Sequence, residues 1–155
     1  MTRFIDQSYQ QYINMIKHTE PFLHYSIENF LPEQKYQQLT AIYSHLQFLE
    51  KESDLFHFYQ TNELAQEPSL DFFKKELSGK FKEITTMKET TYNIFASYYF
   101  KGNYLLCHDD VVEDRKFAFS YYLEDHPSGE LVLYDNTASK VVKKVKVKKN
   151  LLVIF

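Results

Sequence analysis

The sequence predicts an α+β fold in which a helical first part is followed by a β-rich second part. Apolar residues recur every three or four positions in the first part, whereas short β-branched and aromatic runs dominate from Thr90 onward. The length of 155 residues suits one domain, and 13 Tyr and 14 Phe supply apolar surface for a core. We therefore expect one domain over 1–155, with a helical cap over about 1–89 and a β-rich body over about 90–155.

Two helices are expected in the first part, with a weaker helical pattern near its start. Pro32 opens the first helix, because proline lacks the amide hydrogen that would stay unpaired in a first turn. Its apolar stripe continues to Leu49. The second helix begins near Pro68, and Gly79 should divide it into two shorter helices. The N-terminal pattern covers about 6–18.

Six strands are expected in the second part, because turn residues such as Gly102-Asn103 and Ser128-Gly129 separate its apolar runs. Both faces of the third run are apolar or aromatic, so this strand should be covered on both sides, as in a sandwich or roll. The expected strands cover about 91–100, 103–110, 116–123, 130–135, 140–148 and 150–155.

The composition excludes several classes of protein. The formal net charge of -3 gives no global basic field for nucleic acid. Cys107 is the single cysteine, which excludes an internal disulfide and indicates a reducing compartment, so we expect the cytoplasm, with the nucleus as the alternative. We expect Cys107 itself to be a small core residue. No apolar run has the length of a membrane span, and no membrane partner is expected.

The strongest candidate for chemistry is the run Leu105-Leu106-Cys107-His108-Asp109-Asp110. Residues two apart in an extended strand point the same way, so His108 and Asp110 can reach one metal while Asp109 faces away. One imidazole and one carboxylate are two corners of the 2-His-1-carboxylate arrangement that holds non-haem Fe(II), and a second histidine is required. On the motif alone, the alternative is a polar turn after a strand.

Six lysines in ten residues mark the segment 140–149. One interpretation is an electrostatic patch for RNA or for an acidic surface. The other is an edge strand with valines inward and lysines outward, where charge prevents unwanted pairing. We favour the edge strand, because no aromatic residues interleave to stack on bases, and we expect no direct nucleic-acid binding.

A longer series of residues resembles a known family. The matching residues are Tyr99, Leu105-Leu106-Cys107-His108-Asp109-Asp110, Arg115, Ala118-Phe119, Tyr121-Tyr122-Leu123, Gly129-Glu130-Leu131, Leu133-Tyr134 and Asn150-Leu151-Leu152-Val153, with Asn29-Phe30-Leu31-Pro32-Glu33 before them. In order and spacing they resemble the 2-oxoglutarate- and Fe(II)-dependent prolyl hydroxylases that modify a small-subunit ribosomal protein.

The resemblance implies a double-stranded β-helix, or jelly-roll, braced by N-terminal helices. It implies that His108 and Asp110 are iron ligands and that Tyr99 and Tyr122 lie near 2-oxoglutarate, although core packing is the alternative for both tyrosines. No catalytic side chain beyond the metal ligands is implied. The implied cofactors are Fe(II), 2-oxoglutarate and O2, with ascorbate as an optional addition. Arg115 can meet substrate or a neighbouring carboxylate, and the sequence leaves both open.

The family's second iron-binding histidine and its 2-oxoglutarate-binding arginine lie beyond the strand that corresponds to 150–155. We therefore expect that the C-terminal strands are missing and that the chain is inactive in this form. The expected function is hydroxylation of a prolyl residue in a protein substrate, a small-subunit ribosomal protein by the resemblance. One alternative is a catalytically dead jelly-roll that binds a protein partner. The other is an RNA binder that uses the lysine-rich segment.

Overall fold

A computed structural model describes residues 15–86, 91–112 and 114–155, and the structural statements below concern these residues. They form two compact units. The terminal unit contains the described residues up to Pro32 together with those from Cys107 to Phe155. The central unit is Glu33–Leu106. Each unit is described by itself.

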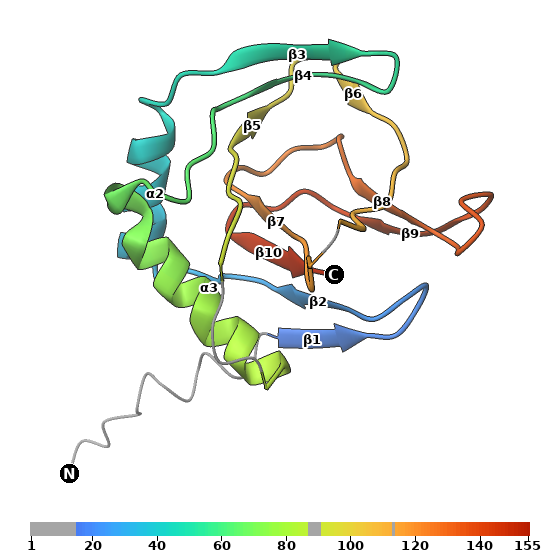
Figure 1. Ribbon diagram of the computed structural model, residues 1–155, viewed down its shortest axis with the longest axis horizontal. Coiled ribbons are helices and arrows are strands. Elements are labelled where there is room, and N and C mark those ends of the chain that lie inside the picture. Colours follow the sequence, from blue (N-terminus) through green and yellow to red (C-terminus); the bar gives the residue numbers. More distant parts are fainter. Residues whose placement is uncertain (1–14, 87–90, 113) are drawn as a thin grey trace. The chain divides into compact units, whose positions relative to one another are not determined.

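A four-stranded antiparallel sheet forms the centre of the terminal unit, in the order β1-β2-β10-β7 (Figure 1). Its strands are β1 (Met15–His18), β2 (His24–Ile27), β7 (Phe119–Tyr122) and β10 (Leu151–Ile154). Strand β10 thus lies between a strand from the start of the described chain and one from its second half. Leu152 is opposite Ile27 on one side and Tyr121 on the other.

Strand β10 is the most deeply buried element of the terminal unit, with every residue between 0 and 3% exposed. Its entry is fixed by Asn150, a residue type that tolerates the left-handed backbone found there (φ 58°). The Asn150 Oδ1 accepts hydrogen bonds from the Leu31 amide and the Tyr121 hydroxyl, each at 2.8 Å. Its Nδ2 donates to the Leu31 carbonyl at 2.8 Å. One side chain therefore satisfies three groups around the core strand.

A separate antiparallel hairpin in the terminal unit consists of β8 (Leu131–Tyr134) and β9 (Val141–Val145). The expected outward lysines are only partly confirmed. Val141 and Val142 are 41% and 44% exposed, whereas Lys143 is half-buried and lies opposite Leu133, which is 5% exposed. A register shift between Leu133 and Tyr134 interrupts the ladder, so the simple alternation of valine and lysine does not hold across the strand.

The central unit combines helices with a small antiparallel sheet. The helices are α2 (Glu33–Tyr43), the 3-10 helix η2 (Pro68–Leu70) and α3 (Asp71–Ile84). The strands are β3 (Leu49–Ser53), β4 (Phe56–Gln60), β5 (Ser97–Tyr98) and β6 (Tyr104–Leu105), with β4 paired to the other three. None of the helices in the described part combines the length and the apolar character of a membrane-spanning segment.

Helix α3 forms because Phe73, Leu77 and Phe81 recur at a spacing of four residues and bury one face, each being 0–4% exposed. The prediction that Gly79 divides this helix is wrong. Glycine costs about 1 kcal/mol relative to alanine inside a helix. Burial of the flanking Leu77 and Phe81 outweighs that cost, since each large side chain contributes roughly 1.5–3 kcal/mol.

Three further predictions for the first part are wrong in extent or type. Helix α2 ends at Tyr43, and Leu49 instead begins a strand. Met15–His18 is a strand rather than the end of a helix, while 6–14 lie outside the described residues. Strands β1 to β4 all lie in the expected helical cap. They were not predicted, because short half-exposed strands give a weak hydropathy pattern and are stabilised by hydrogen bonds to neighbouring strands.

The β-rich character of the second part is confirmed. Each of the six expected runs contains a strand, although every strand is shorter than expected. The largest difference concerns 103–110, where regular pairing ends at Leu105. The assignment of one domain with a boundary near residue 89 stays a prediction.

Candidate metal centre

The candidate metal ligands lie in the terminal unit on an irregular segment, residues 107–112, which we call the ligand loop. Because β6 ends at Leu105, His108 and Asp110 are not on a strand, and the alternation argument does not apply to them. The expectation that Cys107 is a core residue is wrong, because the thiol is exposed. The loop nevertheless brings the two candidate ligands together.

The His108 Nε2 and the Asp110 Oδ1 are 3.9 Å apart, and their side chains are 48% and 37% exposed. Zinc bonds to imidazole and carboxylate measure about 2.0–2.2 Å, so two ligands of one such ion are at most about 4.4 Å apart. Two ligands at about 90° to each other, as in the facial arrangement, would be about 3.0 Å apart, so the two side chains lie within reach of one ion and would move closer by about 0.9 Å to bind it. In the described ranges, no group of three or more His, Cys, Asp or Glu side chains is arranged to hold a metal.

Arg115 contacts one of the candidate ligands. Its Nη1 donates to the backbone carbonyl of Asp110 at 3.2 Å and to the Asp110 Oδ1 at 3.3 Å. Of the two roles that the sequence left open for Arg115, the structure shows contact with the neighbouring carboxylate. This double contact limits rotation of the Asp110 side chain, and it places a positive charge beside the oxygen that faces His108.

The two tyrosines that the resemblance singled out belong to different units. Tyr99 lies in the central unit, and its ring stacks on Phe58 with the centroids 5.2 Å apart. Burial raises the pKa of the Tyr99 phenol, although 47% of the residue's surface stays exposed. Tyr122 is half-buried on β7, opposite Leu151. A role for either phenol in binding 2-oxoglutarate stays a prediction.

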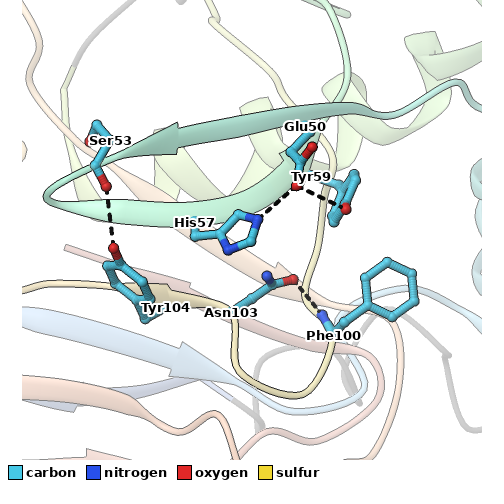
Figure 2. Close-up of polar contacts among 7 residues, drawn as sticks. All are labelled: Glu50, Ser53, His57, Tyr59, Phe100, Asn103 and Tyr104. Carbon is cyan, nitrogen blue, oxygen red and sulfur yellow. Dashed lines mark hydrogen bonds and ion pairs between the residues drawn. The ribbon is translucent and has the colours of Figure 1, made fainter.

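A polar cluster that the sequence did not predict lies across β3 and β4 in the central unit. The Glu50 Oε1 accepts hydrogen bonds from the His57 Nε2 at 2.8 Å and from the Tyr59 hydroxyl at 3.2 Å (Figure 2). These bonds, that from His57 first, lower the pKa of Glu50, and the bond to Glu50 raises the pKa of Tyr59. Cross-strand register would have revealed the cluster, but neither strand was predicted.

Loop contacts close the same region of the central unit. The Asn103 Oδ1 accepts a hydrogen bond from the Phe100 amide at 2.7 Å, and the Tyr104 hydroxyl donates to the Ser53 carbonyl at 3.2 Å (Figure 2). These contacts order the turn between β5 and β6. They are structural contacts around an exposed surface, where ion pairs and hydrogen bonds contribute little to stability.

A second unpredicted cluster lies in the terminal unit, where His18 and His24 stack with their ring centroids 4.5 Å apart. Both rings contact the Lys143 ammonium. The sequence pattern singled out neither histidine. No local signal links them to a lysine about 120 residues away, because only the packing of β9 against the β1–β2 hairpin brings these side chains together.

Comparison with known sequences identifies the class of protein. The sequence profile of the 2OG-Fe(II) oxygenase superfamily matches residues 94–155, a stretch that contains the ligand loop and strands β5 to β10. This family implies the jelly-roll fold, and the described part of the chain, made mostly of strands in sheets with helices beside them, is consistent with it.

Curated relatives narrow the class. The chain is 31% identical over 120 residues, 72% of its length, to prolyl 3-hydroxylase sudestada1 of Drosophila melanogaster. It is 32% identical over 152 residues (88% of the chain) to prolyl 3-hydroxylase OGFOD1 of Mus musculus. The identity to prolyl 3-hydroxylase OGFOD1 of Xenopus laevis is 35% over 150 residues (87% of the chain). The matches span 22–28% of the length of these relatives. The chain belongs to the prolyl hydroxylase family of 2OG-Fe(II) oxygenases.

Proposed function

We propose that this chain is part of a 2-oxoglutarate- and Fe(II)-dependent dioxygenase that hydroxylates a prolyl residue of a protein. The observation that carries the proposal is the approach of the His108 Nε2 to the Asp110 Oδ1, 3.9 Å apart, within the matched stretch. An imidazole and a carboxylate this near to each other can close around one ion and so would supply two of the three protein ligands of a non-haem Fe(II) site.

In this proposal His108 and Asp110 hold Fe(II). When bound, Fe(II) supplies the oxidative chemistry, in which 2-oxoglutarate and O2 yield succinate and CO2 and one oxygen atom enters a prolyl C–H bond. The neutral His108 imidazole offers a nitrogen lone pair, and the Asp110 carboxylate offers negative charge. Arg115 orients that carboxylate through its contacts with the Asp110 carbonyl and Oδ1. Ascorbate is an optional addition to the reaction.

Two groups that the reaction needs are proposed to come from sequence beyond residue 155. They are the second histidine ligand and a cationic partner for the distal carboxylate of 2-oxoglutarate. Tyr99 and Tyr122 are proposed as hydrogen-bond donors to the co-substrate, since a phenol can donate to a carboxylate. On this proposal the 155 residues alone, lacking the remaining strands of the jelly-roll, do not turn over.

The proposed substrate is a proline in a small-subunit ribosomal protein, acted on in the cytoplasm or the nucleus. The names of the relatives support a prolyl substrate and say nothing of a ribosome. Mass spectrometry of candidate ribosomal proteins, after incubation with the full-length protein, tests this point. Gain of one oxygen atom on a prolyl residue supports it. Modification confined to other proteins would contradict it.

The test of the proposed activity is formation of succinate from 2-oxoglutarate by the full-length protein. We expect His108→Ala and Asp110→Ala each to reduce turnover by at least about 100-fold. Even the loss of a residue that only hydrogen-bonds a metal ligand typically lowers metal affinity or activity by about 10–100-fold. Asp109→Ala is the matched control, because this neighbouring carboxylate is not proposed as a ligand. Unchanged turnover in His108→Ala would remove His108 from the site.

The second candidate function is that of a catalytically dead jelly-roll that binds a protein partner. It is favoured by one observation, the lack of a third metal ligand within the described part of the chain. A full-length protein that binds a prolyl peptide and forms no succinate from 2-oxoglutarate, with Fe(II) and O2 supplied, would support this alternative. Succinate formation that depends on His108 would exclude it.

A further inference from the structure

His18 from β1, His24 from β2 and Lys143 from β9 form a cluster in the terminal unit. The Lys143 Nζ is 2.9 Å from the His18 Nδ1 and 3.1 Å from the His24 Nε2. The two imidazole rings are nearly parallel, with 13° between their planes. Three nitrogen atoms from three strands therefore converge on one point.

The partners of these nitrogens define the protonation state of the cluster. The His24 Nδ1 lies 2.9 Å from the Phe22 carbonyl, which can only accept, so this nitrogen carries the proton and the Nε2 accepts from Lys143. An ammonium can only donate, so the His18 Nδ1 is also an acceptor, and the His18 Nε2–H donates to the Ser26 hydroxyl at 2.8 Å. Both imidazoles are neutral, and Lys143 carries the charge.

Burial shapes the electrostatics of this cluster. His24 is 1% exposed and Lys143 is half-buried. Burial, with the neighbouring charge of Lys143, lowers the pKa of His18 and of His24, while the hydrogen bond to Phe22 opposes the shift at His24. Burial also lowers the pKa of Lys143. A partly desolvated ammonium whose partners are neutral gains from a nearby anion.

A pocket of about 330 Å³ is lined by His18, His24 and Lys143 and is strongly cationic. Its other charged residues are Lys144, Lys146, Lys148 and Glu28. The Glu28 Oε1 forms an ion pair with the Lys148 Nζ at 2.6 Å, and the Lys144 Nζ forms one with the Glu130 Oε2 at 3.9 Å. In the described ranges neither Lys143 nor Lys146 forms an ion pair with a carboxylate, so the pocket has excess positive charge.

We propose that this pocket is a binding site for a phosphate-type oxyanion, with Lys143 as its central cation. Two of the three ammonium hydrogens of Lys143 are used by the imidazoles, and the third is left for a ligand. A tetrahedral dianion offers several oxygens, and lysines bind such groups as point charges from several directions. The site uses neither His108 nor Asp110, and it does not depend on the proposed oxygenase function.

The shape and lining of the pocket favour a small phosphoryl group over a nucleic-acid chain. The lining contains no phenylalanine or tyrosine on which a base could stack. Free phosphate and the phosphoryl group of a small metabolite share the required chemistry. Parallel titrations with inorganic phosphate and with a sugar monophosphate distinguish them. The compound that binds more tightly indicates which kind of ligand the site takes.

The imidazoles make the site responsive to protons. Protonation turns the His18 Nδ1 and the His24 Nε2 from acceptors into donors, and it places two further positive charges beside Lys143. The charged groups around them are Glu28, which directly follows β2, Lys143 and Lys144 from β9, and Lys146 and Lys148 after it. Lys17 from β1 and Glu20 after it line a neighbouring pocket together with His18 and Lys143. An oxyanion therefore binds the protonated cluster more tightly, and its affinity rises as the pH falls below the ordinary imidazole pKa, at lower pH than for free imidazoles because burial and Lys143 lower the pKa of both rings.

The test follows the imidazole NMR signals of His18 and His24 during titration with sulfate, which stays dianionic over the whole pH range, and with phosphate. We expect saturable shifts, tighter sulfate binding near pH 5.5 than near pH 7.5, and at least about tenfold weaker binding in Lys143→Met. Lys140→Met is the matched control, since this lysine precedes β9 and does not line the pocket. His108→Ala should leave oxyanion binding unchanged even if it abolishes turnover.

A second variant separates binding from folding. Lys146→Gln leaves the contacts of Lys143 intact and should weaken binding by a few-fold while the histidine signals of the free protein stay in place. Shifts that grow linearly with salt and are matched by chloride would overturn the proposal. So would Lys143→Met binding sulfate as tightly as Lys140→Met does. The lysines would instead form an open RNA-binding surface if the protein bound an RNA oligonucleotide more tightly than phosphate and if Lys143→Met and Lys140→Met weakened that binding equally.

Discussion

Strand β10 and the ligand loop belong to the same unit but differ in almost every physical respect. Every residue of β10 is 0–3% exposed, and the strand is paired on both sides. In the ligand loop the side chains of His108 and Asp110 are 48% and 37% exposed, and Val111 is 84% exposed. The difference shows that one segment of this unit supplies much of the buried core, while another carries the candidate metal ligands. This division is expected when functional groups lie on loops of a rigid scaffold.

The largest effect on stability is expected in β10. Leu152→Ala removes a side chain that is 0% exposed and should lower the free energy of unfolding by about 2–5 kcal/mol. Denaturant unfolding of the purified chain measures this change. Val111→Ala in the ligand loop is the matched control and should change the same quantity by less than about 0.5 kcal/mol. Equal effects at the two positions would abolish the contrast.

The next largest effect is expected where β10 begins. Asn150→Ala removes the side chain that bonds the Leu31 amide, the Leu31 carbonyl and the Tyr121 hydroxyl, and a buried group that loses a hydrogen bond costs about 1–3 kcal/mol. We expect a loss of about 2–4 kcal/mol in unfolding free energy. Tyr121→Phe removes one of these bonds and should cost about 1 kcal/mol. A larger loss in Tyr121→Phe than in Asn150→Ala would show that Asn150 is not the organising residue.

The ligand loop should tolerate substitutions that β10 does not. His108→Ala and Asp110→Ala remove side chains that are 48% and 37% exposed, so each should change unfolding free energy by less than about 0.5 kcal/mol. Thermal unfolding, monitored by circular dichroism, measures the change. A loss comparable to that of Leu152→Ala would mean that the pair is structural.

The sequence predicted these two segments with unequal success, for physical reasons. Strand β10 was recognisable because five consecutive apolar residues after Asn150 can only be buried. His108 and Asp110 were expected to meet because of strand geometry, whereas a loop in fact brings them together. Their proposed role came from the family resemblance and not from local pattern.

Other parts of the fold lay beyond sequence reasoning. Strands β3 and β4 pair through backbone hydrogen bonds that leave little trace in hydropathy, so the Glu50 cluster was invisible. The contact of His18 and His24 with Lys143 joins residues more than a hundred positions apart. Helix α3 was predicted because its buried face repeats regularly, and only its continuity through Gly79 was missed.

The smallest expected effect concerns the exposed cluster of the central unit. Because hydrogen bonds from His57 and then Tyr59 lower the pKa of Glu50 in the folded state, ionised Glu50 stabilises the fold above its ordinary pKa. This contribution is lost as the pH falls through the lowered pKa. Carbon-13 NMR titration of the carboxyl group should show the pKa rising in His57→Gln and rising less in Tyr59→Phe. The reverse order would assign the larger effect to Tyr59.

The most direct test of the candidate metal centre is binding of Mn²⁺, a paramagnetic relative of Fe(II) that accepts imidazole and carboxylate ligands. Because paramagnetic broadening detects even weak binding, a two-ligand site is within reach of this measurement. We predict that substoichiometric Mn²⁺ broadens the NMR signals of His108 and Asp110 first, and that this selectivity disappears in His108→Ala but persists in Asp109→Ala. Broadening centred elsewhere, or unchanged by His108→Ala, would contradict the assignment.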